Sequence, residues 1–161
     1  MAKLEMILPL GDPRLHEKCE PVRPDEVESL KPVISNLHDI IFEFRARYNA
    51  GRAIAAPQIG CMKRLIYMHI DRPVVFFNPV LSNLSEEMFE LWDDCMCFPN
   101  LLVRLKRHKS LTITYRDENW IEHSRDMKDD LSELLQHEYD HLEGILATQR
   151  ACDSRSFRWR S

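Results

Sequence analysis

The segment His137-Glu138-Tyr139-Asp140-His141 holds the side chains best suited to chemistry in this sequence. On a helix that advances about 100° per residue, His137 and His141 lie about 40° apart and one turn from each other, so both imidazoles can reach one ion. Glu138 lies on the same broad side, where a carboxylate can take a proton from a water molecule on the metal and pass it to a leaving amine. Two histidines four apart also occur by chance on surface helices. The intervening glutamate and a strong apolar helix face make that interpretation much weaker.

A catalytic ion of this kind needs a third protein ligand and an open position for water. Asp, Glu, His and Cys side chains all qualify. Cys95 and Cys97 stand just before a predicted strand, and a thiol next to a dication loses its proton. Taken alone, such cysteines are more often small buried residues, so the residue pattern leaves the third ligand open.

Two helices are expected to position these groups. Apolar residues recur every three or four positions from Pro24 to Tyr48, which predicts a long amphipathic helix. A second helix is predicted from about Arg125 or Asp129 to Leu142, followed by Gly144, which is well suited to end it. Its apolar stripe predicts that three polar residues face away from the leucines. They are Glu133, Gln136 and Asp140.

Four short segments rich in β-formers predict strands, and we expect these strands to pair in antiparallel fashion. They are Leu65 to Ile70, Val74 to Phe77, Leu101 to Leu105 and Leu111 to Tyr115. The expected fold is α+β, a single domain over residues 1–161, with a long N-terminal helix and a central metal-binding helix among short antiparallel sheets. Residues 1–22, rich in turn formers, are expected to form a surface arm.

Composition excludes several classes of function. The 161 residues carry a formal charge of −4, which gives no general reason to expect DNA or RNA binding. Residues 150–161 are locally basic, and docking through this tail is a weaker interpretation than a solvated end. No apolar run reaches the roughly 18 residues that a membrane span needs, and no secretory signal is evident, so we expect a cytoplasmic protein. The five cysteines argue against a disulfide framework.

Three segments together resemble the peptide deformylase family, in the family's order. Gly51 to Gln58 is similar to its motif G-x-G-[LI]-A-A-x-Q, Asp93 to Cys97 to E-G-C-L-S, and Gln136 to Gly144 to Q-H-E-x-D-H-L. The likeness covers most of the chain. It implies an enzyme that removes the N-formyl group from the N-terminal methionine of newly made polypeptides, with the formyl-methionyl peptide or nascent chain as its partner. It also implies one divalent metal ion, with Fe²⁺ as the native metal and Zn²⁺, Ni²⁺ or Co²⁺ as substitutes.

The resemblance also assigns roles to particular residues. It makes Cys95 the third metal ligand beside His137 and His141. Gln58 and the backbone N–H of Met96 become hydrogen-bond donors to the oxyanion, and Glu138 protonates the departing amine. It pairs Arg107 with Asp93. The substrate-binding set that it implies is Arg52, Ala53, Ile54, Asp94, Cys97 and Leu134.

The sequence departs from the family pattern near the substrate. Ala53 and Asp94 replace glycines, and Asp94 would be strained if the backbone there needs a positive φ. By their offset from His137, Glu133 and Asp130 fall among the positions that line the family's methionine pocket, where Glu133 would need a partner such as Arg52. The alternatives are therefore a deformylase-like amidase with altered preference, or an inactive metal-binding relative that acts as a binding module. A generic zinc protease would share H-E-x-x-H but not Cys95. Weak ribosome association through the basic tail is a further expectation.

Overall fold

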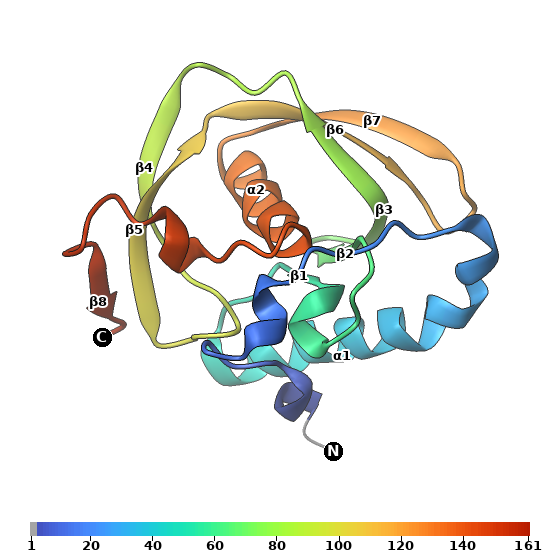
Figure 1. The fold of residues 1–161 in the computed structure, drawn as a ribbon, viewed down its shortest axis with the longest axis horizontal. Coiled ribbons are helices and arrows are strands. Elements are labelled where there is room, and N and C mark those ends of the chain that lie inside the picture. Colours follow the sequence, from blue (N-terminus) through green and yellow to red (C-terminus); the bar gives the residue numbers. More distant parts are fainter. Residues whose placement is uncertain (1–2) are drawn as a thin grey trace.

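Helix α2 (Asp130–Leu142) lies at the centre of the molecule, and strands arch around it (Figure 1). The structure, a computed structural model, describes residues 3 to 161. In chain order the elements are η1 Lys3–Met6, η2 Pro13–His16, η3 Pro24–Glu26, η4 Glu28–Leu30, α1 Lys31–Tyr48, β1 Ala53–Ala55, η5 Ala56–Ile59, β2 Leu65–His69, β3 Pro73–Ser82, β4 Met88–Asp93, β5 Leu101–His108, β6 Ser110–Arg116, β7 Glu122–Lys128, α2, η6 Ala147–Arg150 and β8 Phe157–Trp159, where η denotes a 3-10 helix. This is an α+β fold.

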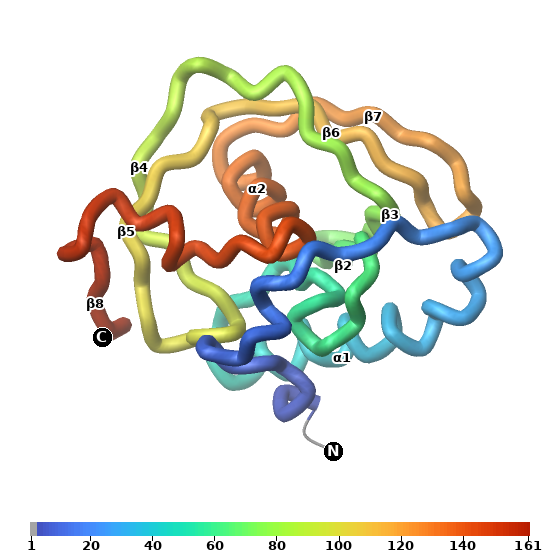
Figure 2. The backbone as a smooth tube through the Cα atoms, in the orientation of Figure 1, coloured from blue at the N-terminus to red at the C-terminus, as the bar shows by residue number. Residues whose placement is uncertain are grey.

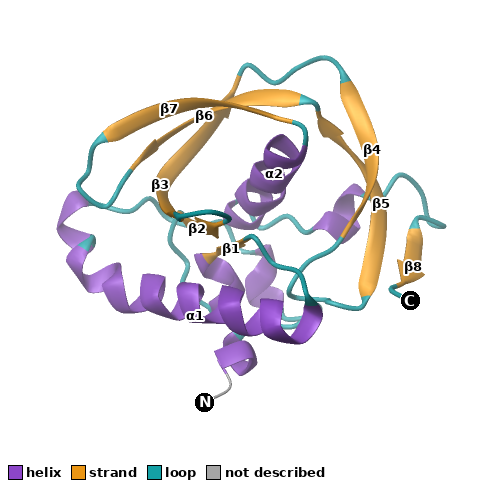
Figure 3. Ribbon diagram, turned by 180° about the vertical axis from the view of Figure 1, so that it is seen from behind, coloured by secondary structure: helices purple, strands orange, loops and turns teal. Residues whose placement is uncertain are grey.

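Two antiparallel sheets enclose α2. The larger has the strand order β1-β2-β3-β6-β7, and the smaller has the order β4-β5-β8. Seen from behind, the larger sheet separates α1 from α2, and the smaller sheet stands at the other side of α2 (Figure 3). Side chains from both sheets therefore reach α2.

Alternation along β2 explains how the larger sheet is covered on both faces. Leu65 and Tyr67 belong to the apolar cluster shared with α1, whereas Ile66 and Met68 belong to the cluster shared with α2. Successive side chains on a strand point to opposite faces, so one strand serves both layers. A third cluster, around Val103 and Leu105, packs under the smaller sheet.

A residue with a left-handed backbone ends α1, and another follows the end of α2. Asn49 has φ 53° and its N–H donates to the carbonyl of Arg45, which ends α1. Past the end of α2, Gly144 has φ 74°, and a Cβ there would lie 2.5 Å from the carbonyl oxygen of His16. Only glycine permits both this backbone and this close approach.

The helix and strand predictions are largely confirmed, with three corrections. The first long helix begins at Lys31, because residues 24–30 form two 3-10 turns instead of α-helix. A start of the second helix at Arg125 is wrong, since that residue lies in β7, whereas a start near Asp129 agrees with the structure. All four predicted strands are present, but β1, β4, β7 and β8 were not predicted.

The two chain ends pack more closely than expected. The arm passes beside the end of α2, where the N–H of Cys19 donates to the carbonyl of Leu142 (Figure 2), and its Leu8 and Leu15 are buried. The part of that prediction that concerns residues 1 and 2 lies outside the described residues. The basic tail contains β8, which pairs with β5, so it is not a free end. Among residues 3 to 161, no helix is long and apolar enough to cross a membrane.

Candidate metal centre

The three proposed ligands come from two elements. Cys95 lies on the turn that follows β4, and His137 and His141 lie one turn apart on α2. One ligand atom from each residue falls within 4.8 Å of the others, and all three side chains are buried. The sulfur of Cys95 lies 3.4 Å from Nε2 of His141. The fold thus brings together a thiol and two imidazoles that are more than forty positions apart in sequence.

The chemistry of this group fits a divalent ion. Sulfur and nitrogen bound tetrahedrally to one zinc-sized ion lie roughly 3.5 Å apart, which matches the Cys95 to His141 distance. Burial raises the pKa of the Cys95 thiol, and a cation beside the sulfur offsets that cost. Burial and the nearby His137 lower the pKa of His141, which keeps its imidazole neutral, as a ligand must be.

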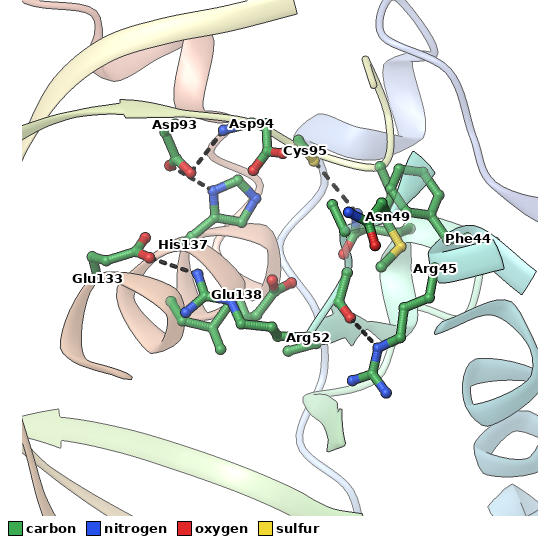
Figure 4. A pocket seen from close by; sticks show the side chains of 16 residues that line it. Phe44, Arg45, Asn49, Arg52, Asp93, Asp94, Cys95, Glu133, His137 and Glu138 are labelled. Carbon is green, nitrogen blue, oxygen red and sulfur yellow. Dashed lines mark hydrogen bonds and ion pairs between the residues drawn. The ribbon is translucent and has the colours of Figure 1, made fainter. Parts of the chain in front are cut away.

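Asp93 fixes the orientation of His137. Its Oδ2 lies 2.8 Å from Nδ1 of His137, which leaves Nε2 free to face an ion (Figure 4). Burial alone would raise the pKa of Asp93, but His137 and Arg107 lower it to about 2. Burial alone would lower the pKa of His137, but Asp93 raises it to about 9 when no ion is present, so a bound ion would displace the proton on Nε2. The Nη2 group of Arg107 also donates to Asp93, at 3.2 Å, so the expected pairing of these two residues is present.

A second buried carboxylate completes this polar network. Asp140 accepts a hydrogen bond from Nη1 of Arg107 at 2.8 Å and two from Arg150 at 2.5 and 2.9 Å. Two carboxylates and two guanidinium groups therefore neutralise one another beneath the metal ligands. Asp140 points away from the leucine stripe, as expected, but on that side of α2 it meets Arg107 of the smaller sheet and is buried.

Glu138 is the group best placed for proton transfer. It is buried, and its Oε1 has no hydrogen-bond partner within residues 3 to 161. Burial raises the pKa of Glu138 to about 7. A carboxyl group with a pKa near neutrality can both accept and donate a proton, which suits general acid and base chemistry.

Gln58 and Met96 stand beside the same ligands. The side-chain oxygen of Gln58 accepts from the N–H of Ala55 at 2.9 Å, and its NH₂ group lies 3.5 Å from the sulfur of Cys95 and 3.4 Å from that of Cys97. Gln58 is only 1% exposed. This hydrogen bond aims the amide donor at the thiol side of the centre.

A cavity of about 500 Å³ opens beside the metal ligands. The predicted binding residues Arg52, Ala53, Asp94 and Leu134 line it, together with Gln58, Met96 and Glu138. Ile54 and Cys97 lie outside its lining, because they are buried in apolar clusters behind it. Asp94 has no positive φ, and its carboxylate pairs with Arg160, so the strain considered for this position is not found.

Several cavity residues had no signal in the sequence. Phe44, Arg45 and Asn49 reach the cavity from the end of α1. The helix pattern predicted Phe44 as a core residue only. Helix geometry put Glu133 on the polar side of α2, and the family resemblance put it among the pocket positions. It is 7% exposed and lines the cavity, where it accepts a hydrogen bond from Arg52 at 2.7 Å. The expected pairing of Glu133 with Arg52 is present.

The chain is similar to known proteins over most of its length. Residues 4–156 match the family described as polypeptide deformylase. A peptide deformylase of Pseudothermotoga lettingae is 35% identical over 150 residues, which covers 92% of this chain and 83% of the relative. A peptide deformylase of Treponema pallidum is 33% identical over 147 residues, 91% of this chain and 87% of the relative. The crystal structure of the Thermotoga maritima peptide deformylase matches with a TM-score of 0.83 at 28% identity, covering 91% of this chain and 97% of that one.

An antiparallel α+β fold around a buried H-E-x-x-H helix, with a thiol beside its histidines, defines a class of metal-dependent hydrolases. The chain belongs to the polypeptide deformylase family. Members of this family remove the formyl group from the amino terminus of new polypeptides, and so does this chain.

Proposed function

We propose that this chain deformylates nascent polypeptides with one divalent ion held by Cys95, His137 and His141. The activity follows from the family, and the roles of individual residues are our proposal. The observation that carries it is the 3.4 Å approach of the Cys95 sulfur to Nε2 of His141 beside the cavity that Glu138 lines. A bound divalent ion lowers the pKa of water to about 7 and so supplies a nucleophile at neutral pH.

The protein's own groups carry the remaining steps. The NH₂ group of Gln58 and the backbone N–H of Met96 donate hydrogen bonds to the oxygen that becomes negative as the formyl carbon turns tetrahedral. Each such donor contributes about 2.7 to 4 kcal/mol to lowering the barrier. Glu138 accepts the proton of the attacking water and delivers it to the departing amine.

The native ion is the finer part of the proposal. One thiolate and two imidazoles suit Fe²⁺, Zn²⁺, Ni²⁺ and Co²⁺ alike, and we propose Fe²⁺ on the family resemblance. Metal analysis of protein purified without oxygen is expected to find about one iron per chain. A Cys95→Ser variant, which replaces a soft ligand with a hard one, is expected to lose most of its metal. Unchanged metal content in that variant would remove Cys95 from the ligand set.

Glu138→Ala tests whether the site is catalytic. Turnover of formyl-Met-Ala-Ser is expected to fall by about 10² to 10⁴-fold, the usual contribution of a general acid or base, while metal content stays the same. A wild-type protein that binds metal but does not release formate would favour the alternative of a binding module.

Two further proposals concern the setting of the enzyme. We propose that residues 1–161 act as one catalytic domain in the cytoplasm, where ribosomes make its substrate, and that the basic tail associates weakly with the ribosome. Arg155 has no ion-pair partner within residues 3 to 161, although Arg150 and Arg160 are paired with Asp140 and Asp94. Co-sedimentation with ribosomes at low salt is expected to weaken for Arg155→Glu and to stay unchanged for the exposed control Lys128→Glu.

A further inference from the structure

Glu133 and Leu134 lie directly beside the reacting groups. Glu133 precedes His137 by four residues, and Leu134 precedes Glu138 by four, so each lies one turn of α2 away, about 5.4 Å along the axis, on the same side. All four line the same cavity (Figure 4). A peptide whose terminal amide is held at His137 and Glu138 therefore has Glu133 and Leu134 within reach of its first side chain.

Arg52, from the segment that precedes β1, lines the same side of the cavity as Glu133 and Leu134. Its Nη2 group donates to Oε1 of Glu133 at 2.7 Å, and its Nη1 group lies 3.7 Å from Oδ2 of Asp130. The Glu133 side chain is 9% exposed, and within residues 3 to 161 Arg52 is the one ion-pair partner of this buried carboxylate. The Arg52 side chain is 38% exposed and stays accessible from the cavity.

Arg52 has N–H donors that no protein acceptor within residues 3 to 161 uses. Arginine has five N–H donors, and within residues 3 to 161 the Arg52 guanidinium has one hydrogen-bond acceptor, Glu133. Ala53 and Leu134 supply apolar surface on the same cavity. The pocket for the first side chain is therefore amphipathic. An apolar pocket rejects a polar side chain because lost hydration is not replaced, but here the spare donors of Arg52 can replace it.

We propose that Arg52 and Glu133 determine which first side chain the enzyme accepts, and that they admit side chains bearing a hydrogen-bond acceptor, such as methionine sulfoxide and glutamine, alongside methionine. This inference rests on the proposed function. A sulfoxide oxygen accepts from the guanidinium of Arg52. A glutamine side chain, similar in length to methionine, accepts from Arg52 and donates to Glu133.

The test compares kcat/KM for formyl-Met-Ala-Ser, its methionine sulfoxide form and formyl-Gln-Ala-Ser. The wild type is compared with the double variant Arg52→Leu, Glu133→Leu, because removal of both partners leaves no unpaired buried charge. The preference for methionine over its sulfoxide and over glutamine is expected to rise at least tenfold in the double variant. The pair Arg52→Gln, Glu133→Gln keeps donors and acceptors without charge and is expected to retain the wild-type ratios.

A matched control removes another ion pair, Arg104 with Glu90, whose 3.1 Å contact lies outside the cavity. The double variant Arg104→Leu, Glu90→Leu is expected to leave all ratios unchanged. Calorimetric titration with the unformylated product peptides gives the same comparison without turnover. A wild type that rejects the sulfoxide and glutamine as strongly as the leucine pair does, in turnover or in binding, refutes the inference. Absence of formyl-Met-Ala-Ser turnover alongside selective product binding would instead refute the proposed function.

Discussion

Asp93 contacts both a proposed metal ligand and the cluster of buried charges. Its carboxylate is hydrogen-bonded to His137 and accepts a hydrogen bond from the guanidinium of Arg107. It also accepts one from the backbone N–H of Asp94, the residue before Cys95. One carboxylate thus holds one histidine ligand directly and the turn of the thiol ligand through the backbone. We expect its loss to disturb both arms of the ligand set.

Asp93→Asn is expected to weaken metal affinity by about 10 to 100-fold, the usual effect of removing the partner of a histidine ligand. The amide can still hydrogen bond to His137, but it brings no negative charge against the imidazole or Arg107. Competition with a chromogenic chelator measures the affinity. Asp126→Asn, on exposed strand β7, is the control, and an affinity for Asp93→Asn equal to that control would contradict the prediction.

Gly51 allows close packing under the catalytic turn. It has φ 115°, and a Cβ there would lie 3.0 Å from Cε of Met96, the residue after Cys95. Gly51→Ala is expected to cost about 1 to 2 kcal/mol in free energy of unfolding for the backbone alone, with a further loss from the contact. Gly11→Ala is a matched control, since Gly11 has φ 107° and no atom within 4 Å of where a Cβ would lie. Urea unfolding should show the larger loss at Gly51, and equal losses would show that the Met96 contact costs nothing.

The residues of the candidate site differ in how far the sequence alone predicts their positions and roles. The two histidines and Glu138 follow from helix geometry alone, whereas Cys95 needed the family likeness, because nothing local tells a ligand thiol from a buried one. For Glu133 the sequence indicated two different positions. Its offset from His137 put it among the family's pocket positions, whereas its helix position opposite the leucine stripe put it on a polar side. The structure has it buried on the cavity and paired with Arg52, because packing buries a side of α2 that helix geometry alone cannot distinguish from an exposed one.

At the scale of elements, the strands that sequence patterns miss either have almost no buried apolar face, as β4 and β7 do, or are very short, as β1 and β8 are. β7 has no buried residue and is held by its backbone pairing with β6. β4 buries only Asp93, and β1 and β8 are three residues long. Alternating hydrophobicity in the sequence identifies a strand only when one of its faces packs against a core. Strands held mainly by backbone pairing with a neighbour leave no such pattern and cannot be predicted from it.

The β6 to β7 turn gives a prediction about pH. The carboxylate of Asp117 accepts hydrogen bonds from the N–H groups of Asn119 and Ile121. Its Oδ2 also lies 2.7 Å from Nε2 of His123, and this hydrogen bond is the main reason that the pKa of Asp117 is lowered. A lowered folded-state pKa means stability that is present above the ordinary value and lost as pH falls through the folded one. Asp117→Asn is expected to cost at most about 1 kcal/mol at pH 7 and progressively less below pH 4. Urea unfolding at pH 7 and pH 3 tests this, and a cost equal at both would exclude the charge as its source.

At the scale of the whole molecule, α2 is a helix rich in polar residues that lies in the interior of the fold. From Ser132 to Leu142 only Tyr139 is not buried, although the segment carries two histidines and three carboxylates. Both sheets contact it, and the polar side chains find partners on β4, β5 and the segment before β1. The core of this protein therefore also holds its candidate active site, and the groups proposed for chemistry take part in joining the two sheets.

Because the ion would tie α2 to the turn after β4, metal removal is expected to lower global stability as well as activity. A ligand present at 100 to 1,000 times its Kd stabilises the folded state by about 2.7 to 4.1 kcal/mol, which corresponds to roughly 5 to 15 °C in Tm for a chain of this size. Thermal unfolding with and without a chelator measures the shift, and added Zn²⁺ or Co²⁺ should restore it. Cys95→Ser should show little response to the chelator. A wild-type Tm that is insensitive to metal would mean that the polar network of Asp93, Arg107 and Asp140 joins the sheets without help from the ion.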